Sequence, residues 1–490
     1  MTKKGFFLLL LPLFAKAETK DTLRLDLTDA IALAVEQSPS AKSARNTFLA
    51  AYWNYRYYCA NYLPSVTLAS SPSLNSTINQ ITRPDGTSAF VKQNQLNTNL
   101  QMKINQNIPW TGGSIFVTSN LNRLDELSNK ATSYSSQPLS IGYQQDLFGY
   151  NSLKWERRIE PLRYQQACKD YAEAVELVSA STCSRFFSYV VAQTNLELAR
   201  RNFASADTLY HIAEGRYQIG NINENEMLQL EINRLNEEAN CLDAEVELEE
   251  EKQRIRSFLG LEQDVPLMLL PPDSIPHFQI PMEQATELAL ENSPDPVYYR
   301  ILLLNGESSL ENAKANSGLK ADLYVQFGLS QTGDKLSTSY RNLLHQEYAS
   351  VGLSLPILDW GRRKGRVRVA ESNLELARTQ VDQGMQDFRQ NIQKAVMQFN
   401  MQDRKVALAS KKMQQAQHRY EVAHRLYVMG RNTVLDLNTA ISEKDASRRS
   451  YISALSTFWS LYYTIRSITG WDFEHNEAIT MQDAELSSRK

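Results

Sequence analysis

The chain has 490 residues, 42% of them hydrophobic and 22% charged, and its net charge at pH 7 is -3. This composition excludes a disordered chain and an inner-membrane transporter built from many apolar helices. The slight negative charge gives no reason to expect nucleic acid as a partner. The length allows one very elongated domain or two to three compact ones.

Residues 1–17 are expected to be a signal peptide. Lys3 and Lys4 precede an apolar run from Phe6 to Phe14, and Ala15-Lys16-Ala17 follows as a small-x-small cleavage site. The alternative, a short membrane anchor, is disfavoured because about ten apolar residues are too few for a spanning helix. No run of 18 apolar residues follows Ala17, so the exported chain is expected to be soluble or to enter a membrane as a β-barrel.

The chain repeats itself. Ala30, Leu33 and Ser38-Pro39 recur as Ala285, Leu288 and Ser293-Pro294, and Tyr217, Gly220 and Glu226 recur as Tyr427, Gly430 and Asp436. Fixed internal similarity of this kind indicates two copies of one structural unit. The expected organisation is a signal peptide at 1–17, a first repeat at 18–261, a Pro-rich linker at 262–278, a second repeat at 279–471 and a C-terminal tail at 472–490.

Segments that alternate apolar and polar residues predict β-strands in each half. They lie at 99–108 and 139–144 in the first half and at 321–331 and 350–356 in the second. Such alternation fits any half-buried sheet, but the export signal and a second face rich in Asn, Gln, Ser and Gly favour a membrane barrel with a water-filled lumen. Two strands per half give about four per chain, too few to close a barrel, so several chains are expected to share one. The residues alone do not fix how many.

The first half contains a longer stretch than its counterpart. Residues 81–137 correspond to only 332–348 in the second half, and they include the turn signal Pro109-Trp-Thr-Gly-Gly113 between two strand-like runs. An added hairpin and a large extracellular loop are both compatible with this stretch.

A very long helix is predicted in each half, at 152–218 with one early Pro161 and at 362–428. Apolar residues in the second helix recur in steps of three and four, which is a coiled-coil seam. Each helix would be about 100 Å long, so it needs packing partners along its whole length. Gly220 and Gly430 are expected to end these helices, with Asn221 or Asn223, and Asn432 or Thr433, capping the return helices.

No catalytic or metal-binding set of residues emerges. The six histidines lack metal-ligand spacing, and no nucleophile and base lie at a recognisable spacing. The basic run at 362–366 on an exported chain indicates a solvated face. Trp110, Phe148, Tyr150 and Trp360 lie at predicted strand ends, where they form either an aromatic girdle at a membrane interface or ordinary packing. No enzyme activity, cofactor or metal is therefore expected.

Four motifs carry a resemblance to a known family. They are Leu355–Ala377 with its Pro-Ile-Leu-Asp-Trp-Gly-Arg-Arg start, Gln144–Asn151 as its first-half counterpart, Tyr62–Val66 before the first strand, and Tyr427–Leu437 at the second hairpin turn. In order and spacing the chain resembles the TolC-like outer-membrane efflux proteins, the outer-membrane factors of tripartite efflux systems. The resemblance covers essentially the whole mature chain.

The resemblance implies a mainly α fold with a membrane β-barrel. A homotrimer would share a twelve-stranded barrel, four strands per chain, that continues into a long α-helical tunnel in the periplasm. The protein would lie in the outer membrane of a Gram-negative bacterium, in contact with outer-membrane lipid, and would act as a passive, porin-like exit channel for small molecules. An inner-membrane pump would supply the energy, joined through a periplasmic adaptor protein.

The resemblance also assigns residues. The adaptor would grip the hairpin tips at Gly220, Gly430, Tyr217 and Tyr427. The acidic entrance gate of the family would fall on Asp436, with Glu226 as its first-half counterpart. Thr439 stands where a second acidic residue is usual, so the ring would carry less charge, and Arg431 lies one residue before the usual place of a latching arginine.

Two rival functions remain beside efflux of small molecules. The same duct could serve a type I protein secretion system, which only the partners would distinguish. A secreted coiled-coil structural protein without a pore is disfavoured by the alternating strands, and an exported enzyme is the weakest alternative because no catalytic set is present.

Overall fold

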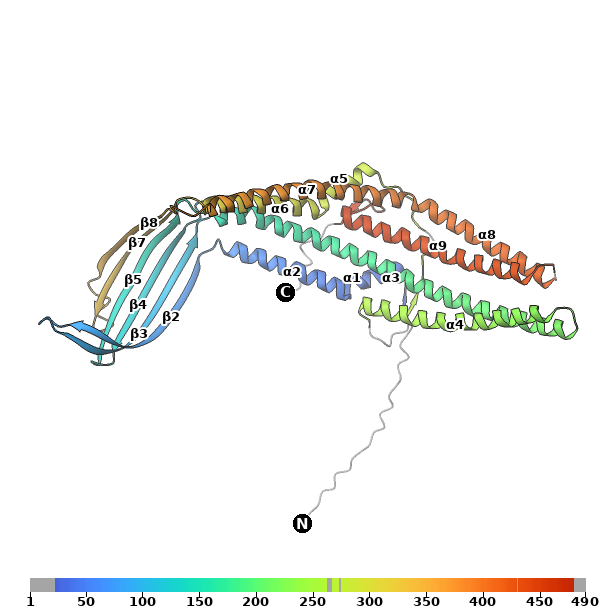
Figure 1. The fold of residues 1–490 in the computed structure, drawn as a ribbon, viewed down its shortest axis with the longest axis horizontal. Coiled ribbons are helices and arrows are strands. Elements are labelled where there is room, and N and C mark those ends of the chain that lie inside the picture. Colours follow the sequence, from blue (N-terminus) through green and yellow to red (C-terminus); the bar gives the residue numbers. More distant parts are fainter. Residues whose placement is uncertain (1–22, 262–266, 273–274, 430, 480–490) are drawn as a thin grey trace, which may run out of the picture. The chain divides into compact units, whose positions relative to one another are not determined.

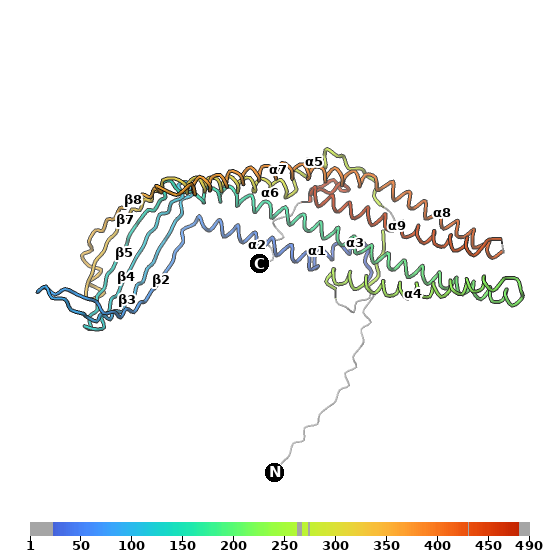
Figure 2. Tube along the Cα trace, in the orientation of Figure 1, coloured from blue at the N-terminus to red at the C-terminus, as the bar shows by residue number. Residues whose placement is uncertain are grey.

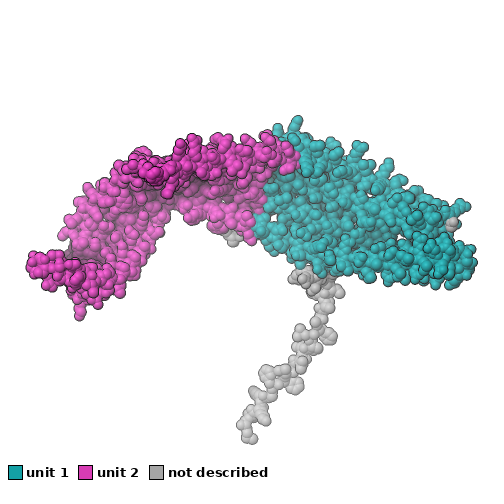
Figure 3. Space-filling model, in the orientation of Figure 1, with its two compact units in different colours: residues 1–45, 172–289, 392–490 teal, residues 46–171, 290–391 magenta. Residues whose placement is uncertain are grey.

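The computed structural model describes residues 23–261, 267–272, 275–429 and 431–479 (Figures 1 and 2). The expected signal peptide, Gly430, parts of the linker and the end of the tail lie outside the described residues. The chain forms two compact units, one of residues 46–171 and 290–391 and the other of residues 1–45, 172–289 and 392–490 (Figure 3). Each unit therefore combines segments from both sequence repeats.

The first of these units contains a six-stranded antiparallel sheet in the order β2-β3-β4-β5-β7-β8 (Figure 1). Its strands are β2 (Ser65–Thr82), β3 (Ser88–Asn107), β4 (Ser114–Glu126), β5 (Ala131–Asp146), β7 (Lys320–Gly333) and β8 (Leu344–Ser354). β5 of the first half pairs directly with β7 of the second half, so the two repeats share one sheet.

The expected strand number of about four per chain is wrong, because the sheet has six. The two strands that alternation did not predict are β2 and β4, and the long stretch at 81–137 forms β3, β4 and the start of β5 rather than a large loop. Pro109–Gly113 makes the turn between β3 and β4, where the Ile108 N–H donates to Gly113 O at 2.8 Å. Alternation alone did not reveal β2 because Ser70, Pro72 and Ser76 interrupt its apolar positions, although the Tyr62–Val66 motif stands at its start. A proline is tolerated there because β2 is an edge strand.

Helices continue from the sheet in the same unit. They are α2 (Pro39–Ala60), α6 (Asp295–Ala315) and the sheet-proximal parts of α3 (Ser152–Gln218) and α7 (Arg362–Asn400). Trp155 and Ile159 of α3 are buried against Val297 and Ile301 of α6. The Trp155 indole N–H donates to Glu311 at 3.0 Å, which satisfies the polar group of this buried side chain.

Each half begins with two helices. α1 (Leu27–Gln37) precedes α2, and α5 (Met282–Asn292) precedes α6. The break falls on the repeated Ser-Pro pair, because proline lacks the N–H that would continue a helix but suits the first turn of a new one. Ser38 is fully buried and accepts a hydrogen bond from the Ala41 N–H at 3.0 Å, capping α2.

The second unit is built around two antiparallel helical hairpins. The first joins α3 to α4 (Glu224–Leu259) and the second joins α8 (Gln402–Val428) to α9 (Val434–Thr469). α3 has the predicted bounds, and predicted seam residues of the second long helix are buried, including Ile392, Phe399 and Val406. In the same unit β1 (Leu23–Leu25) pairs in parallel with β6 (Leu267–Leu269), so part of the linker adds a strand to the N-terminal segment.

The second long helix is interrupted at Met401, where a single helix was expected. The side-chain amide of Asn400 donates to Ile280 O and accepts from the Ile280 N–H, both at 2.9 Å. Next to the break, Gln402 is buried and donates to Ala454 O at 3.1 Å. These contacts with other segments divide the helix into α7 and α8.

A buried ionic network ties α9 to α3 in this unit. The Arg466 guanidinium donates to Glu176 at 2.9 Å and to Asp472 at 2.5 Å. Asp472 also accepts from the Tyr462 hydroxyl at 2.6 Å. Burial opposes the charge on Asp472, yet the hydrogen bonds from Tyr462 and His475 and the charge of Arg466 hold the pKa of this carboxyl below its usual value.

No helix among the described residues is long and apolar enough to cross a membrane.

Candidate functional site at the hairpin ends

The turn between α3 and α4 is built on glycine. Gly220 has a φ of +76°, a left-handed conformation that suits glycine, and its N–H donates to Tyr217 O at 2.9 Å. The Asn221 N–H donates to Arg216 O, and Asn223 caps α4 by accepting from the Glu226 N–H at 2.9 Å. Of the two predicted caps, Asn223 is the one used.

The turn between α8 and α9 has the same plan, although Gly430 lies outside the described residues. The Arg431 N–H donates to Leu426 O at 2.9 Å, which closes the end of α8. Thr433, one of the two predicted caps, begins α9. Its hydroxyl accepts from the Asp436 N–H at 3.2 Å, while the Asp436 carboxylate accepts from the Thr433 N–H and hydroxyl at 3.3 and 2.6 Å.

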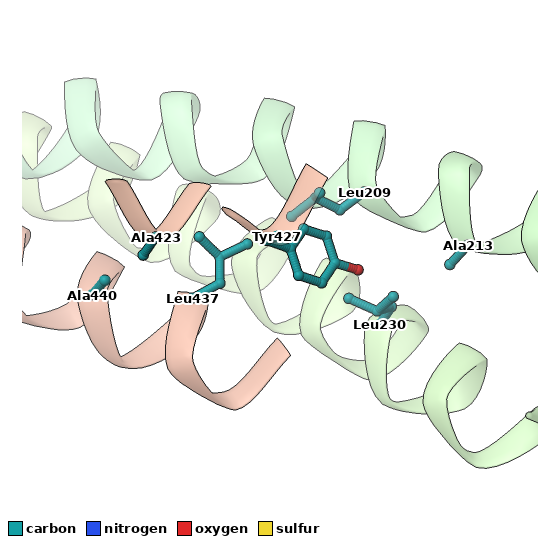
Figure 4. Packing of buried hydrophobic residues seen from close by; sticks show 7 residues of the cluster. All are labelled: Leu209, Ala213, Leu230, Ala423, Tyr427, Leu437 and Ala440. Atoms are coloured by element: carbon teal, nitrogen blue, oxygen red, sulfur yellow. The ribbon is translucent and has the colours of Figure 1, made fainter. Parts of the chain in front are cut away.

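The two hairpins pack against each other at their ends. One apolar cluster joins all four helices, with Tyr427 at its centre (Figure 4). Its buried members are Leu209, Ala213, Leu230, Ala423, Tyr427, Leu437 and Ala440. The Arg216 guanidinium also reaches across to Val428 O at 3.4 Å. The two turns are therefore held as one structure rather than as independent arms.

Tyr217 and Tyr427 are equivalent in sequence but not in environment. Tyr427 is 8% exposed and lies inside the cluster, whereas Tyr217 is 40% exposed. Burial raises the pKa of the Tyr427 hydroxyl, and the negative charge of Glu226 adds to this effect. Tyr427 therefore belongs to the packing of the hairpin ends, and only Tyr217 offers much surface.

Glu226 and Asp436 occupy the same position in their two helices. Each is the third residue after the cap, at the positive end of the helix dipole, where a carboxylate is stabilised. Both are exposed to solvent. Hydrogen bonds from the Thr433 hydroxyl and backbone lower the pKa of Asp436, so this residue is anionic at neutral pH.

Three exposed apolar residues at the hairpin ends were not singled out from the sequence. Ile219 and Met429 immediately precede the two tip glycines, and Leu435 lies in the first turn of α9. An apolar residue followed by glycine recurs in the two turns of the repeat. This recurrence is the sequence signal that could have identified Ile219 and Met429. Apolar side chains left in solvent at the end of a rigid element are typical of a protein interaction surface.

Comparison with known proteins identifies the fold. Residues 30–261 and 287–470 match the outer membrane efflux protein family. No curated protein matches the chain.

Several solved channels are similar in structure. The CmeC outer membrane channel of Campylobacter jejuni is 15% identical, with a TM-score of 0.67 over 94% of this chain and 88% of that one. The outer membrane protein VceC of Vibrio cholerae is 16% identical, with a TM-score of 0.64 over 91% of this chain and 96% of that one. The MtrE outer membrane channel of Neisseria gonorrhoeae is 15% identical, with a TM-score of 0.59 over 91% and 89%.

The family match spans both halves of the chain, including both helical hairpins. The expected TolC-like fold of long helices and a sheet is confirmed, and the family is one of transport channels rather than of enzymes. The chain belongs to the outer membrane efflux protein family.

Proposed function

We propose that this protein is the outer-membrane exit duct of a tripartite efflux system and exports small molecules passively from the periplasm. The family match over residues 30–261 and 287–470 carries this assignment. We also propose that the two structural repeats, 18–261 and 279–471, act as paired halves of one wall, joined by the 262–278 linker and followed by the 472–490 tail.

The working form is a homotrimer. Strands β2 and β8 are exposed edges of the sheet, and an open edge is not tolerated in lipid. Pairing β2 of one copy with β8 of the next removes every edge at once. Exposed apolar residues on α4 recur in steps of four, three, seven and four, as in a coiled-coil seam that lacks its partner. These residues are Leu228, Ile232, Leu235, Leu242 and Val246.

The hairpin ends are the entrance and the docking point. We assign the periplasmic adaptor protein to a tip surface made of Tyr217, Ile219, Gly220, Met429 and Leu435, with Gly430 in the same turn. Tyr427 supports this surface from below, because its ring is buried between the hairpins. Glu226 and Asp436 are the gate carboxylates, three copies of each around the mouth of the duct.

A cellular experiment tests the assignment. Cells that lack this chain are expected to accumulate ethidium, and the wild-type gene should restore its export, with the protein recovered in the outer-membrane fraction. Unchanged ethidium accumulation, together with loss of specific proteins from the culture medium, would instead indicate a protein secretion duct. Recovery in the soluble periplasmic fraction would contradict both assignments.

A further inference from the structure

The sheet contains two strands that the twelve-stranded plan of TolC-like proteins does not accommodate. If the proposed trimer is correct, on which this inference rests, six strands per chain give eighteen in all. We propose that β3 and β4 are additional membrane-spanning strands of the barrel wall. The exit barrel then has eighteen strands and a wider lumen than a twelve-stranded barrel.

The outer face of β3 and β4 continues the apolar face of their neighbouring strands. The register places Val66, Ile104, Val117, Ile141 and Phe327 in one row across β2, β3, β4, β5 and β7. These five residues are apolar, and the row ends at Glu347 on the edge strand β8. Neighbours on the same face, such as Met102 and Leu100, are exposed apolar residues as well. A face of this kind suits lipid and does not suit an extracellular loop.

The opposite face of the same two strands is polar. In the adjacent row, the register aligns Thr67, Lys103, Thr118, Ser140 and Gly328. Deeper in the sheet, Gln101 pairs with Asn120 and Asn99 with Asn122. Because successive side chains point to opposite faces, β3 and β4 separate a lipid side from a water side as a barrel wall does. The lumen they line is made mostly of neutral amides and hydroxyls.

The turn between β3 and β4 is built into the junction between sheet and helices. Asn151, which caps α3, donates to Pro109 O at 3.0 Å, and Gln145 donates to Thr111 O at 2.8 Å. Gly112 has a φ of +79°, and a Cβ at this residue would lie 2.9 Å from the Asn151 side chain. The turn is therefore fixed at the same level as the strand-to-helix connections.

Exposed tryptophans mark that level. Trp110 in the β3–β4 turn is 82% exposed, and Trp360, which follows β8, is 90% exposed. Tryptophan concentrates where the hydrocarbon core of a membrane meets water. The predicted aromatic girdle is then shared by the additional turn and by the connections to the helices, which places β3 and β4 across the membrane.

The additional strands change the size of the exit. Barrel diameter grows roughly linearly with strand number, so eighteen strands give about 1.5 times the diameter of twelve. At the helical end only four of the six strand ends of each chain continue into helices. The barrel would thus be wider than its helical ring requires, and it would release bulky hydrated cargo without selecting by charge.

Particle imaging of the full protein, purified from outer membranes in mild detergent, tests the proposal. A section through the barrel should show eighteen strands. A trimer with a twelve-stranded wall and residues 83–130 outside it would overturn this inference and leave the proposed function intact. A particle without a shared barrel would contradict the proposed function itself.

A matched pair of variants provides an independent test. Met102→Arg places a charge on the apolar face of β3, and Gln101→Arg places the same charge one residue away on the polar face. We expect Met102→Arg to lower the amount of assembled protein in the outer membrane at least about tenfold, while Gln101→Arg assembles normally. Equal assembly of the two variants would place β3 outside the wall.

Deletion of residues 88–130 removes β3 and β4 and leaves the 83–87 turn to join β2 to β5. We expect the assembled variant to have a barrel about one third narrower than the wild type. An assembled variant with an unchanged barrel diameter would overturn the proposal. If the deletion prevents assembly, the arginine pair and the strand count still decide the question.

Discussion

Arg466 neutralises two carboxylates that come from different segments of the chain. The side chains of Glu176 and Asp472 are 7% and 6% exposed, so removal of the arginine would take away the cation that lies between two buried carboxylates. Arg466→Met is expected to lower the free energy of unfolding by about 3–5 kcal/mol, measured by denaturant unfolding in detergent. The exposed pair Arg200–Glu245 is the control, since Arg200→Ala should cost no more than about 1 kcal/mol. Similar losses in both variants would contradict this role of Arg466.

The same network gives stability a defined pH dependence. The pKa of Asp472 is lower in the folded chain than in the unfolded chain, so its contribution is present above the ordinary pKa of 3.8 and is lost as pH falls through the folded value. Asp472→Asn should therefore be less stable than the wild type at pH 7. Below pH 3.8 the difference should shrink towards zero. A difference that stays constant from pH 7 to pH 3 would show that the charge of Asp472 is not the cause.

The gate assignment predicts ion selectivity. Glu226→Gln together with Asp436→Asn removes the charges but keeps an oxygen that can complete the Thr433 cap, which alanine would not. We expect a weaker preference for cations in single-channel recordings, and a smaller effect at high salt because salt screens exposed charges. Unchanged selectivity at low salt would mean that other residues form the constriction.

A control for the gate variant lies on the same helix. Glu249→Gln with Glu250→Gln also removes two exposed carboxylates, but these residues are more than twenty positions from Glu226 along α4. This control should leave selectivity unchanged. An equal loss of selectivity in the two double variants would indicate a general effect of net charge rather than a gate.

At the scale of the helices, substitutions of the two equivalent tyrosines should have different effects, one on stability and the other on adaptor docking. Tyr427→Ala leaves a cavity in the cluster that joins the hairpins and should cost about 3 kcal/mol, seen as faster hydrogen exchange at the ends of α8 and α9. Tyr217→Ala should change stability by no more than about 0.5 kcal/mol. If Tyr217 belongs to the tip surface, this variant should still reduce cross-linking to the adaptor.

The opposite pattern would contradict this division. A stable Tyr427→Ala protein with normal hydrogen exchange would show that the cluster does not hold the hairpins together. Normal cross-linking in Tyr217→Ala would remove Tyr217 from the tip surface without affecting the packing role of Tyr427.

The sequence predicted the elements that depend on local pattern. The bounds of α3 and the seam of the second long helix follow from the spacing of apolar residues and from Gly220, and both are confirmed. The break at Met401 was missed because Asn400 makes it by bonding Ile280, a contact between residues 120 positions apart. The different burial of Tyr217 and Tyr427 was missed for the same reason, since packing between the hairpins leaves no mark on the repeat.

The number of strands shows more clearly what could not be predicted from the sequence. Alternation was plain in the centre of β3, but the many Asn, Gln and Ser residues around 65–82 conceal β2, and the 81–137 stretch was compatible with a loop. A barrel strand needs only one apolar face, which is a weaker signal than that of a helix. Only the pairing of β2 with β3 over Ser65–Thr82 identifies the segment as part of the sheet.

At the scale of the whole molecule, the proposed duct requires three copies to close one barrel. A single chain leaves β2 and β8 unpaired and the α4 seam in solvent, so its surface is incomplete for a protein in a membrane. The proposed trimer would satisfy the strand edges and the helical seam together. It would also bring the carboxylates of three pairs of hairpin ends around one mouth.

Light scattering of the protein purified from outer membranes, corrected for bound detergent, tests this claim most directly. We expect a protein mass of three chains in mild detergent, retained on dilution because the strand edges need one another. A stable monomer that remains embedded in the membrane would contradict the shared barrel, and with it the proposed duct.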